Sequence, residues 1–244
     1  MLHELRYGRF TSSKIGCLMS LSKDKKDFGA TAKKYIKQKK YERKLGRRID
    51  TENTARPLQY GKCVEGIAFQ KLGTAYRICS DETIPHPLYD FWSGSPDLIK
   101  YVGDEKVICD IKCPMTLESF CDFVEYFSAN GIQGIRDNHP DGETYYWQIV
   151  SNCILCGSTK GELIIYAPYQ EELQSIKDEA SAWGYAWLTF ASDLELPYLT
   201  KDGSYKDINV MAFDIPQSDI DALTANVIKA NELCGYTDFL NTKS

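Results

Sequence analysis

The chain has 244 residues, of which 43% are hydrophobic and 26% are charged, values that exclude a disordered or collagen-like protein and fit one compact domain of mixed α/β type. The first residues lack the basic segment and apolar run of a secretory leader, and no stretch approaches the roughly 18 apolar residues that a membrane span needs, so we expect a soluble, cytoplasmic protein. The formal net charge of −5 argues against a uniformly basic DNA-binding protein.

Two helices are predicted in the N-terminal part. Ser12 or Ser13 can cap a short helix that runs to about Met19. The stretch at about 31–45 is typical of a second helix and lies in the basic segment 23–48, which has twelve Lys and Arg against three Asp and Glu. This local charge of +9 leaves −14 for the rest of the chain. The basic side chains form either a solvated helix face or a track for DNA phosphates, because Lys and Arg displace condensed counterions.

The middle of the chain changes from helical to strand periodicity. A third helix begins near Pro57, and Glu65 lies beside the apolar face of that helix. The following segments are short, rich in β-formers and separated by turn residues such as Gly103 and Asp104, which predicts a hairpin within a sheet. We expect strands at about 76–79, 97–102 and 106–112.

The remaining chain alternates helices with strands. Helices are predicted at about 116–128, 143–156, 171–184 and 216–233, and strands at 162–166 and 207–213. Glycine and proline between 127 and 145 favour a long loop there. The expected fold class is therefore α/β (α+β), with a central mixed β-sheet flanked by helices.

Two acids and a lysine lie on the predicted hairpin. Asp97 follows Gly94-Ser-Pro96, and twelve residues separate it from Asp110, which stands two positions before Lys112. Side chains alternate along a strand, so Asp110 and Lys112 project to one side while Ile111 points into the core. The hairpin turn brings Asp97 back toward Asp110.

The convergence of these acids implies a metal ion, because two close carboxylates repel each other unless a cation neutralises them. Hard oxygen ligands suit Mg²⁺ or Mn²⁺. We expect the metal on Asp97, Asp110 and the backbone carbonyl of Ile111, with open positions for a phosphate. Lys112 would orient or deprotonate a water and offset phosphate charge, and Glu65 would hold a metal-bound water or a second metal.

An acid-x-Lys step alone is common, so the hypothesis depends on the order of several motifs. Five segments carry it: Leu5–Ile15, Tyr60–Glu65, Gly94–Asp97, Asp110–Pro114 and Tyr146–Gln148. In this order the chain resembles the lambda-type exonucleases, also called YqaJ-like viral recombinases, of the PD-(D/E)xK nuclease superfamily. The Tyr-Gly-x-x-x-Glu and Lys-Cys-Pro steps are the more specific matches.

The resemblance implies a processive 5′→3′ exonuclease on linear double-stranded DNA that uses Mg²⁺, for which Mn²⁺ can substitute, and releases 5′-phosphomononucleotides. It implies a homo-oligomer, a trimeric ring threaded by the duplex. It also implies a single-strand annealing protein or recombinase as partner, in a phage-encoded system of a bacterial host cell.

Site residues follow from the resemblance motif by motif. Glu65, Asp97, Asp110 and Lys112 match the catalytic positions, and Gln148 matches a helix glutamine that helps to hold the lysine and the water. The residues that match a binding site for the terminal 5′-phosphate are Arg6, Ser13 and Ser95, one guanidinium and two hydroxyl donors.

The predicted domain organisation is one nuclease domain over 1–244. Its parts are a basic N-terminal helical part that contacts DNA (1–50), a catalytic core (55–215) and a C-terminal helix and tail (216–244).

The chain departs from the family pattern at Glu118, where the motif after Lys-Cys-Pro would place a basic residue near the 5′-phosphate. Arg136, in the predicted loop, is a candidate to supply that charge. If it does not, end recognition differs from the family's.

Alternatives remain open. A related nuclease of other polarity, an endonuclease, and a non-catalytic DNA-binding scaffold fit the same motifs. Cys153 and Cys156 have the C-x-x-C spacing of a metal site, but an iron–sulfur cluster needs four ligands and the nine cysteines are otherwise scattered, so we predict free thiols, mostly buried.

Overall fold

A mixed sheet of five strands forms the centre of the molecule. The computed structural model describes residues 6–23, 26–49 and 55–235. The sheet has the order β2-β5-β6-β7-β8, with β6 and β7 parallel and the other pairs antiparallel. Its strands are β2 (Tyr76–Ile78), β5 (Leu98–Val102), β6 (Glu105–Lys112), β7 (Lys160–Tyr166) and β8 (Ile208–Asp214). The predicted fold class and each predicted strand are confirmed.

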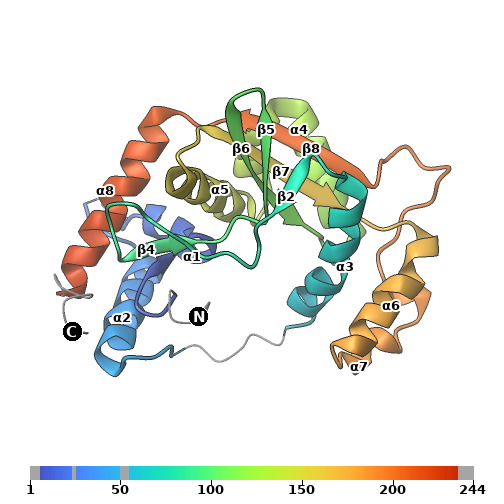
Figure 1. Ribbon diagram of the computed structural model, residues 1–244, viewed down its shortest axis with the longest axis horizontal. Coiled ribbons are helices and arrows are strands. Elements are labelled where there is room, and N and C mark those ends of the chain that lie inside the picture. The colour runs from blue at the N-terminus through green and yellow to red at the C-terminus, as the bar shows by residue number, and fades with distance from the viewer. Residues whose placement is uncertain (1–5, 24–25, 50–54, 236–244) are drawn as a thin grey trace.

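Helices cover both faces of this sheet. Side chains alternate along a strand, so apolar side chains of β6 stand on both faces and each face needs a helical layer to bury them. On β6, Ile111 packs into a core with α3 (Arg56–Leu72) and α6 (Leu173–Ala182). Ile108 packs on the other face, against α4 (Leu117–Asn138) and α5 (Gly142–Cys156). Figure 1 shows α3, α6 and α7 (Ala186–Thr189) to the right of the view and α2 (Ala30–Leu45) and α8 (Gln217–Cys234) to the left.

The N-terminal part joins the core through a second, small sheet. This sheet has the order β1-β4-β3 and consists of β1 (Phe10–Thr11), β4 (Trp92–Gly94) and β3 (Ile84–Pro85). Phe10 and Trp92 are fully buried in the core that also contains residues of α2, α5 and α8. The sequence analysis missed all three strands, since two or three residues show no period. No helix within the described ranges is both long and apolar enough to cross a membrane.

The start of the first helix differs from the prediction. The helix begins as α1 (Ser12–Ile15) and continues as the 3-10 helix η1 (Gly16–Met19). Its N-cap is Thr11, not Ser12 or Ser13, and no side chain caps it. Ser12 is buried instead, and its Oγ lies 2.8 Å from Oγ of Ser151 on α5. The Ser12 hydroxyl, a candidate cap from the local sequence, is thus used in a tertiary hydrogen bond.

The segment predicted as a long loop is mostly helix. Helix α4 continues to Asn138, with a break at Asn130 and Gly131, where Gly131 has a φ of 57°. This backbone conformation favours glycine. The prediction of a loop around Arg136 was therefore wrong. Gly131 marks a kink between two helical segments, not the end of the helix.

Helix α2 has the predicted position, but not all of its charges face solvent. Lys39, Glu42 and Arg43 are buried. Glu42 accepts hydrogen bonds from the Gly8 amide at 2.8 Å and from Lys39 Nζ at 2.9 Å, while Arg43 Nε donates to the Gly8 carbonyl at 2.7 Å. These three side chains anchor the N-terminal segment. Only the other, exposed Lys and Arg side chains of the basic segment can form a solvated face or a track for DNA phosphates.

Gly94 lies where two segments approach too closely for any side chain. A Cβ at this position would overlap Ser12 Oγ and Asn152 Oδ1 and lie 2.8 Å from Leu155 Cδ1. We expect Gly94→Ala to reduce the free energy of unfolding by about 1 to 3 kcal/mol, as overpacking of buried sites does. Urea unfolding followed by circular dichroism measures it.

Gly66→Ala is the matched control, because a Cβ at Gly66 on α3 meets nothing within 4 Å. There alanine should leave stability unchanged or raise it by up to about 1 kcal/mol. Equal stability of the two variants would contradict the packing argument.

Candidate active site

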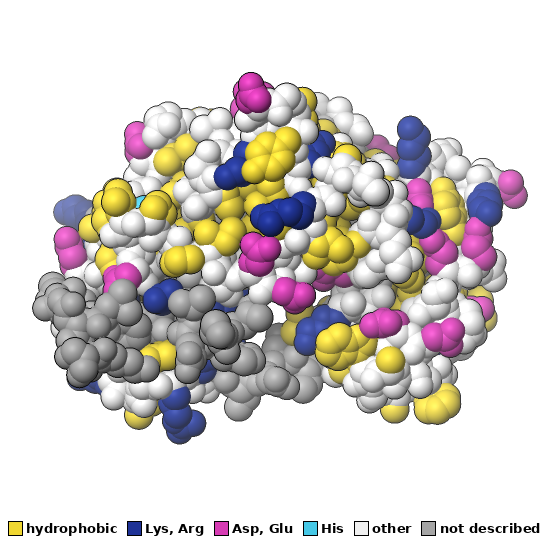
Figure 2. All heavy atoms as spheres, viewed as in Figure 1, with side chains coloured by type: hydrophobic (Ala, Val, Ile, Leu, Met, Phe, Trp, Pro, Cys, Tyr) yellow, Lys and Arg dark blue, Asp and Glu magenta, His cyan; other side chains and the backbone are white. Residues whose placement is uncertain are grey.

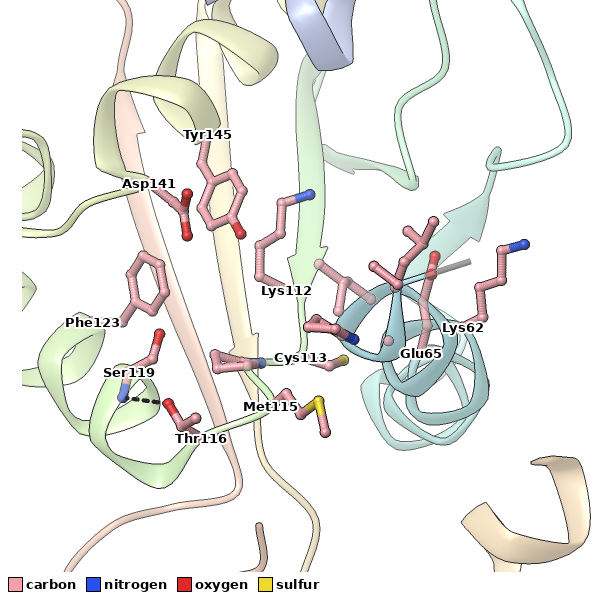
Figure 3. A pocket seen from close by; sticks show the side chains of 16 residues that line it. Lys62, Glu65, Lys112, Cys113, Met115, Thr116, Ser119, Phe123, Asp141 and Tyr145 are labelled. Atoms are coloured by element: carbon pink, nitrogen blue, oxygen red, sulfur yellow. Dashed lines mark hydrogen bonds between the residues drawn. The ribbon is translucent and has the colours of Figure 1, made fainter. Parts of the chain in front are cut away.

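A cleft of about 570 Å³ opens at the end of β6, between α3 on one side and α4 and α5 on the other. Figure 3 shows Lys112 between the helix that carries Glu65 and the helix that carries Tyr145. Thr116 and Ser119, at the start of α4, form the wall opposite α3. Of the predicted site residues, Glu65 on α3 and Lys112 on β6 therefore line this cleft, whereas Asp110 and Gln148 lie outside its lining.

Asp110, two residues before Lys112 on β6, has no exposed surface. Its Oδ1 accepts a hydrogen bond of 2.6 Å from Nε2 of Gln148, and its Oδ2 forms an ion pair with Nζ of Lys112. Strand alternation puts Asp110 and Lys112 on the sheet face that α5 covers, and α5 brings Gln148 over them. A buried carboxylate with two donors is held in one orientation.

Asp97 lies one residue before β5 and is hydrogen-bonded to β6, the strand that carries Asp110. Its Oδ2 accepts a hydrogen bond of 2.8 Å from the backbone amide of Ile111. The hairpin register, with Leu98 opposite Cys109, explains this contact. Burial raises the pKa of Asp97 well above its ordinary value, and the charge of Asp110 raises it further. The sequence-based expectation that the hairpin returns Asp97 to Asp110 agrees with this geometry.

Glu65 faces the same centre from α3. Burial raises the pKa of Glu65 to about 7; the charge of Lys112 opposes this rise, and the charges of Asp110 and Asp81 add to it. Glu65, Asp97 and Asp110 thus interact electrostatically, and their mutual repulsion favours protonation or a bound cation.

Lys112 is held between a carboxylate and an aromatic ring. Its Nζ lies 4.8 Å from the ring centroid of Tyr145. Burial opposes its charge, but Asp110 and Asp97 outweigh burial and raise the pKa of Lys112. The ammonium form is therefore the stable one beside these acids, which suits offsetting negative charge better than accepting a proton.

The aromatic triplet before Gln148 divides between cleft and core. Tyr145 lines the cleft, whereas Tyr146 and Trp147 are buried, and Trp147 Nε1 donates to Glu143 Oε2 at 2.6 Å. Trp147 therefore packs in the core. Sequence reasoning did not single out Tyr145, although it stands three residues before Gln148 and so on the same helix face.

The donor set fits a hard divalent cation. Burial raises the pKa values of both Glu65 and Asp97, and the charge of Asp110 raises them further. Within the described ranges no group of three or more Asp, Glu, His or Cys side chains is placed so that it could hold a metal ion by itself. Mg²⁺ does not need one, since it keeps several waters and uses one or two carboxylates. Such an ion would compete with Lys112 for Asp110 Oδ2.

Comparison with known proteins gives a structural likeness. No protein-family model and no curated protein matches the chain. An alkaline exonuclease (LHK-Exo) from Laribacter hongkongensis has 16% sequence identity and a TM-score of 0.60, over 99% of this chain and 95% of that one. A phage related exonuclease from Haemophilus somnus 129PT has 18% identity and a TM-score of 0.64, over 96% of each chain.

The chain has the fold of these exonucleases. The resemblance drawn from the motifs therefore holds at the level of the fold. Because the likeness extends over nearly the whole chain, the N-terminal helices and α8 are parts of this exonuclease fold.

Two of the three residues predicted to bind a 5′-phosphate lie together in this exonuclease fold. Arg6 NH2 donates to Ser95 Oγ at 2.9 Å, and Thr83 Oγ1 lies 3.4 Å from the same oxygen. The buried Arg6 Nε has no hydrogen-bond partner in the part of the chain that the structure describes. Ser13 is exposed on α1, and no hydrogen bond between described residues joins it to Arg6 or Ser95.

Arg136, the candidate for the positive charge that the family pattern would place at position 118, is engaged by acids of its own chain. Its Nε donates to Glu143 Oε1 at 2.6 Å, its NH1 lies 3.7 Å from Asp219 Oδ2, and its guanidinium lies 3.9 Å from the ring centroid of Tyr146. Arg136 is thus neutralised within the helical layer. Glu118 is exposed in the first turn of α4.

The nine cysteines are free thiols, five buried and four half-buried, as predicted. Cys153 Sγ donates to the Lys160 carbonyl at 3.4 Å, and the region around Cys156 shows no metal-binding group among the described residues. The C-x-x-C spacing thus has a packing explanation.

Proposed function

We propose that the protein is a Mg²⁺-dependent exonuclease that degrades linear double-stranded DNA from its 5′ ends, releases 5′-phosphomononucleotides and leaves a 3′ single strand. The observation that carries the proposal is the buried Asp110, held by Lys112 and Gln148 and interacting electrostatically with Asp97 and Glu65, next to a cleft that Lys112 and Glu65 line. The shared fold supports it, and one solved structure of LHK-Exo is in complex with dAMP.

Asp97, Asp110, Glu65 and the backbone carbonyl of Ile111 would hold the metal, with Mn²⁺ as a substitute. When bound, the ion would polarise the phosphate and lower the pKa of a coordinated water. The protein's own part is positioning: Gln148 fixes Asp110, and the Ile111 amide fixes Asp97.

Lys112 would stabilise the charge that develops on the phosphate. Its ammonium is already formed and lies at the end of β6, facing the cleft between Tyr145 and Asp110. The half-buried Tyr145 ring limits access of water on one side. A charge placed before the reaction requires little reorganisation during it.

End recognition would use Arg6 and Ser95. The unpartnered Arg6 Nε is free to donate to a terminal phosphate. A charge-assisted hydrogen bond contributes about 1.5 to 3 kcal/mol, so Arg6→Ala should slow digestion of 5′-phosphorylated duplex by about 10- to 100-fold.

A duplex with 5′-hydroxyl ends is the matched control for this prediction. On that substrate wild type and Arg6→Ala should digest at similar rates, as gel electrophoresis or release of acid-soluble nucleotide would show. If the substitution slows both substrates equally, Arg6 acts on folding or on general DNA affinity, not on the end.

The alternatives predict different substrates. An endonuclease cuts covalently closed circular DNA, an exonuclease of opposite polarity releases label from the 3′ end, and a DNA-binding scaffold cuts nothing in the presence of Mg²⁺. We further propose a ring-shaped trimer and a single-strand annealing or recombinase partner, both of which rest on the family resemblance. Sedimentation at low salt tests the trimer.

A further inference from the structure

Four side chains form a patch of cations and indoles beside the cleft. Arg56 lies on the ring of Trp187, with 5.1 Å from its Cζ to the centroid, and Lys62 lies on the ring of Trp183, with 5.7 Å from its Nζ. We call these four residues the Trp–cation patch. In Figure 2, dark-blue and yellow side chains adjoin at the lower right of the face, between the lower ends of α3 and α6.

One indole of the patch, that of Trp183, is exposed, which tryptophan seldom is, whereas Trp187 is half-buried. Trp183 is 54% exposed. Its Nε1 already donates to Glu179 Oε1 at 2.7 Å, and the Nε1 of Trp187 donates to Gln59 Oε1. Tyr185 stacks on Trp183 at a centroid distance of 6.2 Å. Both indole N–H groups are thus fixed by hydrogen bonds, and the exposed Trp183 keeps ring surface for another planar group.

The patch has a net positive charge, because its two cations outnumber Glu179, the acid that accepts the hydrogen bond from Trp183. Three further acids of the neighbouring segment are neutralised in ion pairs: Glu171 with Lys201, Glu172 with Lys71 and Asp193 with Lys177. Arg56 and Lys62, by contrast, are exposed and form no ion pair with any residue that the structure describes.

The patch is continuous with the cleft. Lys62 lines the cleft together with Glu65, which is one turn further along α3. In Figure 3 the Lys62 side chain extends away from Lys112, on the outer side of α3. Arg56 and Lys62 are six residues apart, about 9 Å along the helix axis. A strand of more than one nucleotide would therefore span both cations.

We propose that the Trp–cation patch binds single-stranded DNA next to the cleft, with bases on the indoles and phosphates on Arg56 and Lys62. Aromatic faces with adjacent cations are the usual means of holding single strands without sequence preference. In a duplex the base faces are covered by their neighbours, so the indoles select unpaired nucleotides. This inference rests on the proposed nuclease function and adds a separate subsite to it.

Fluorescence anisotropy of a labelled oligo-dT 20-mer, measured in EDTA so that no cleavage occurs, tests the proposal. Trp183→Ala should weaken binding by about 5- to 150-fold, the range of single stacking contacts, and Trp183→Phe should retain most of it. Binding of a blunt duplex of equal length should change less. Intrinsic fluorescence gives a second readout, because Trp92 and Trp147 are buried and only the patch indoles should be quenched by DNA.

Phe190→Ala is the matched control, since Phe190 is 84% exposed on the same part of the molecule and belongs to no cation pair in the described structure. It should bind oligo-dT as wild type does. If Trp183→Ala, with an unchanged melting curve, binds oligo-dT as tightly as wild type, the patch proposal is wrong, and an exposed surface for a protein partner becomes the better explanation. The nuclease proposal fails separately, if wild type does not digest linear duplex with Mg²⁺.

Discussion

Replacing Asp110 with Asn should lower kcat for Mg²⁺-dependent digestion of linear duplex by about 10³-fold or more. The amide keeps the size of the side chain but removes the charge that attracts the metal and pairs with Lys112. A metal ion contributes several kcal/mol of transition-state stabilisation, and each 1.36 kcal/mol is a factor of about ten in rate. Release of labelled mononucleotide under single-turnover conditions measures the effect.

Two controls make this result interpretable. Asp104→Asn changes an exposed acid at the turn of the same hairpin and should leave the rate within about twofold of wild type. Lys112→Ala should reduce kcat by about 10²- to 10⁴-fold with an intact fold by circular dichroism. Full activity of Asp110→Asn or Lys112→Ala would remove the basis of the proposed site.

The metal-free protein should lose stability as pH rises from about 5 to 8, because of Glu65. Its pKa in the folded protein is about 7, against an ordinary value of 4.5. Between these values the folded state binds more protons than the unfolded state, so the free energy of unfolding falls as pH rises. The stability present below pH 4.5 is thus lost by the time pH passes 7, by an amount on the order of 3 kcal/mol. The raised pKa of Asp97 acts in the same direction.

Thermal unfolding in EDTA at several pH values measures this loss. Glu65→Gln should flatten the pH dependence, and Glu118→Gln, at an exposed acid of α4, should not. Mg²⁺ should restore more stability at pH 8 than at pH 5.5, since it binds the ionised carboxylates. A wild-type protein whose stability is constant over this range would show that the three acids do not repel each other in the folded state.

Much of the local structure was predictable because it depends on short-range geometry. Alternation along a strand puts Asp110 and Lys112 on one side and Ile111 on the other, whatever the rest of the chain does. The Gly103–Asp104 turn similarly sets the hairpin that returns Asp97. Element positions were right to within a few residues in most segments long enough to show a period, but α4 runs to Asn138, well beyond its predicted end at about 128.

The errors occurred where partners are distant in sequence. Ser12, one of two candidates for a helix cap, hydrogen-bonds to Ser151, 139 residues away. Arg136, a candidate to serve the DNA end from a loop, lies in a helix and pairs with the nearby Glu143 and with the distant Asp219 on α8. Polar side chains take the best partner that packing offers, and a local pattern does not contain that partner.

For the site itself, the sequence alone predicted which residues would carry the chemistry, and strand alternation determined on which face of β6 Asp110 and Lys112 stand. Only the tertiary structure decided that Gln148 donates to Asp110, that Tyr145 covers Lys112, and that two indoles meet cations beside the cleft. The reason is physical: side-chain direction follows from the backbone of a few residues, whereas contact between α5, α3 and α7 follows from which apolar faces bury each other across the sheet.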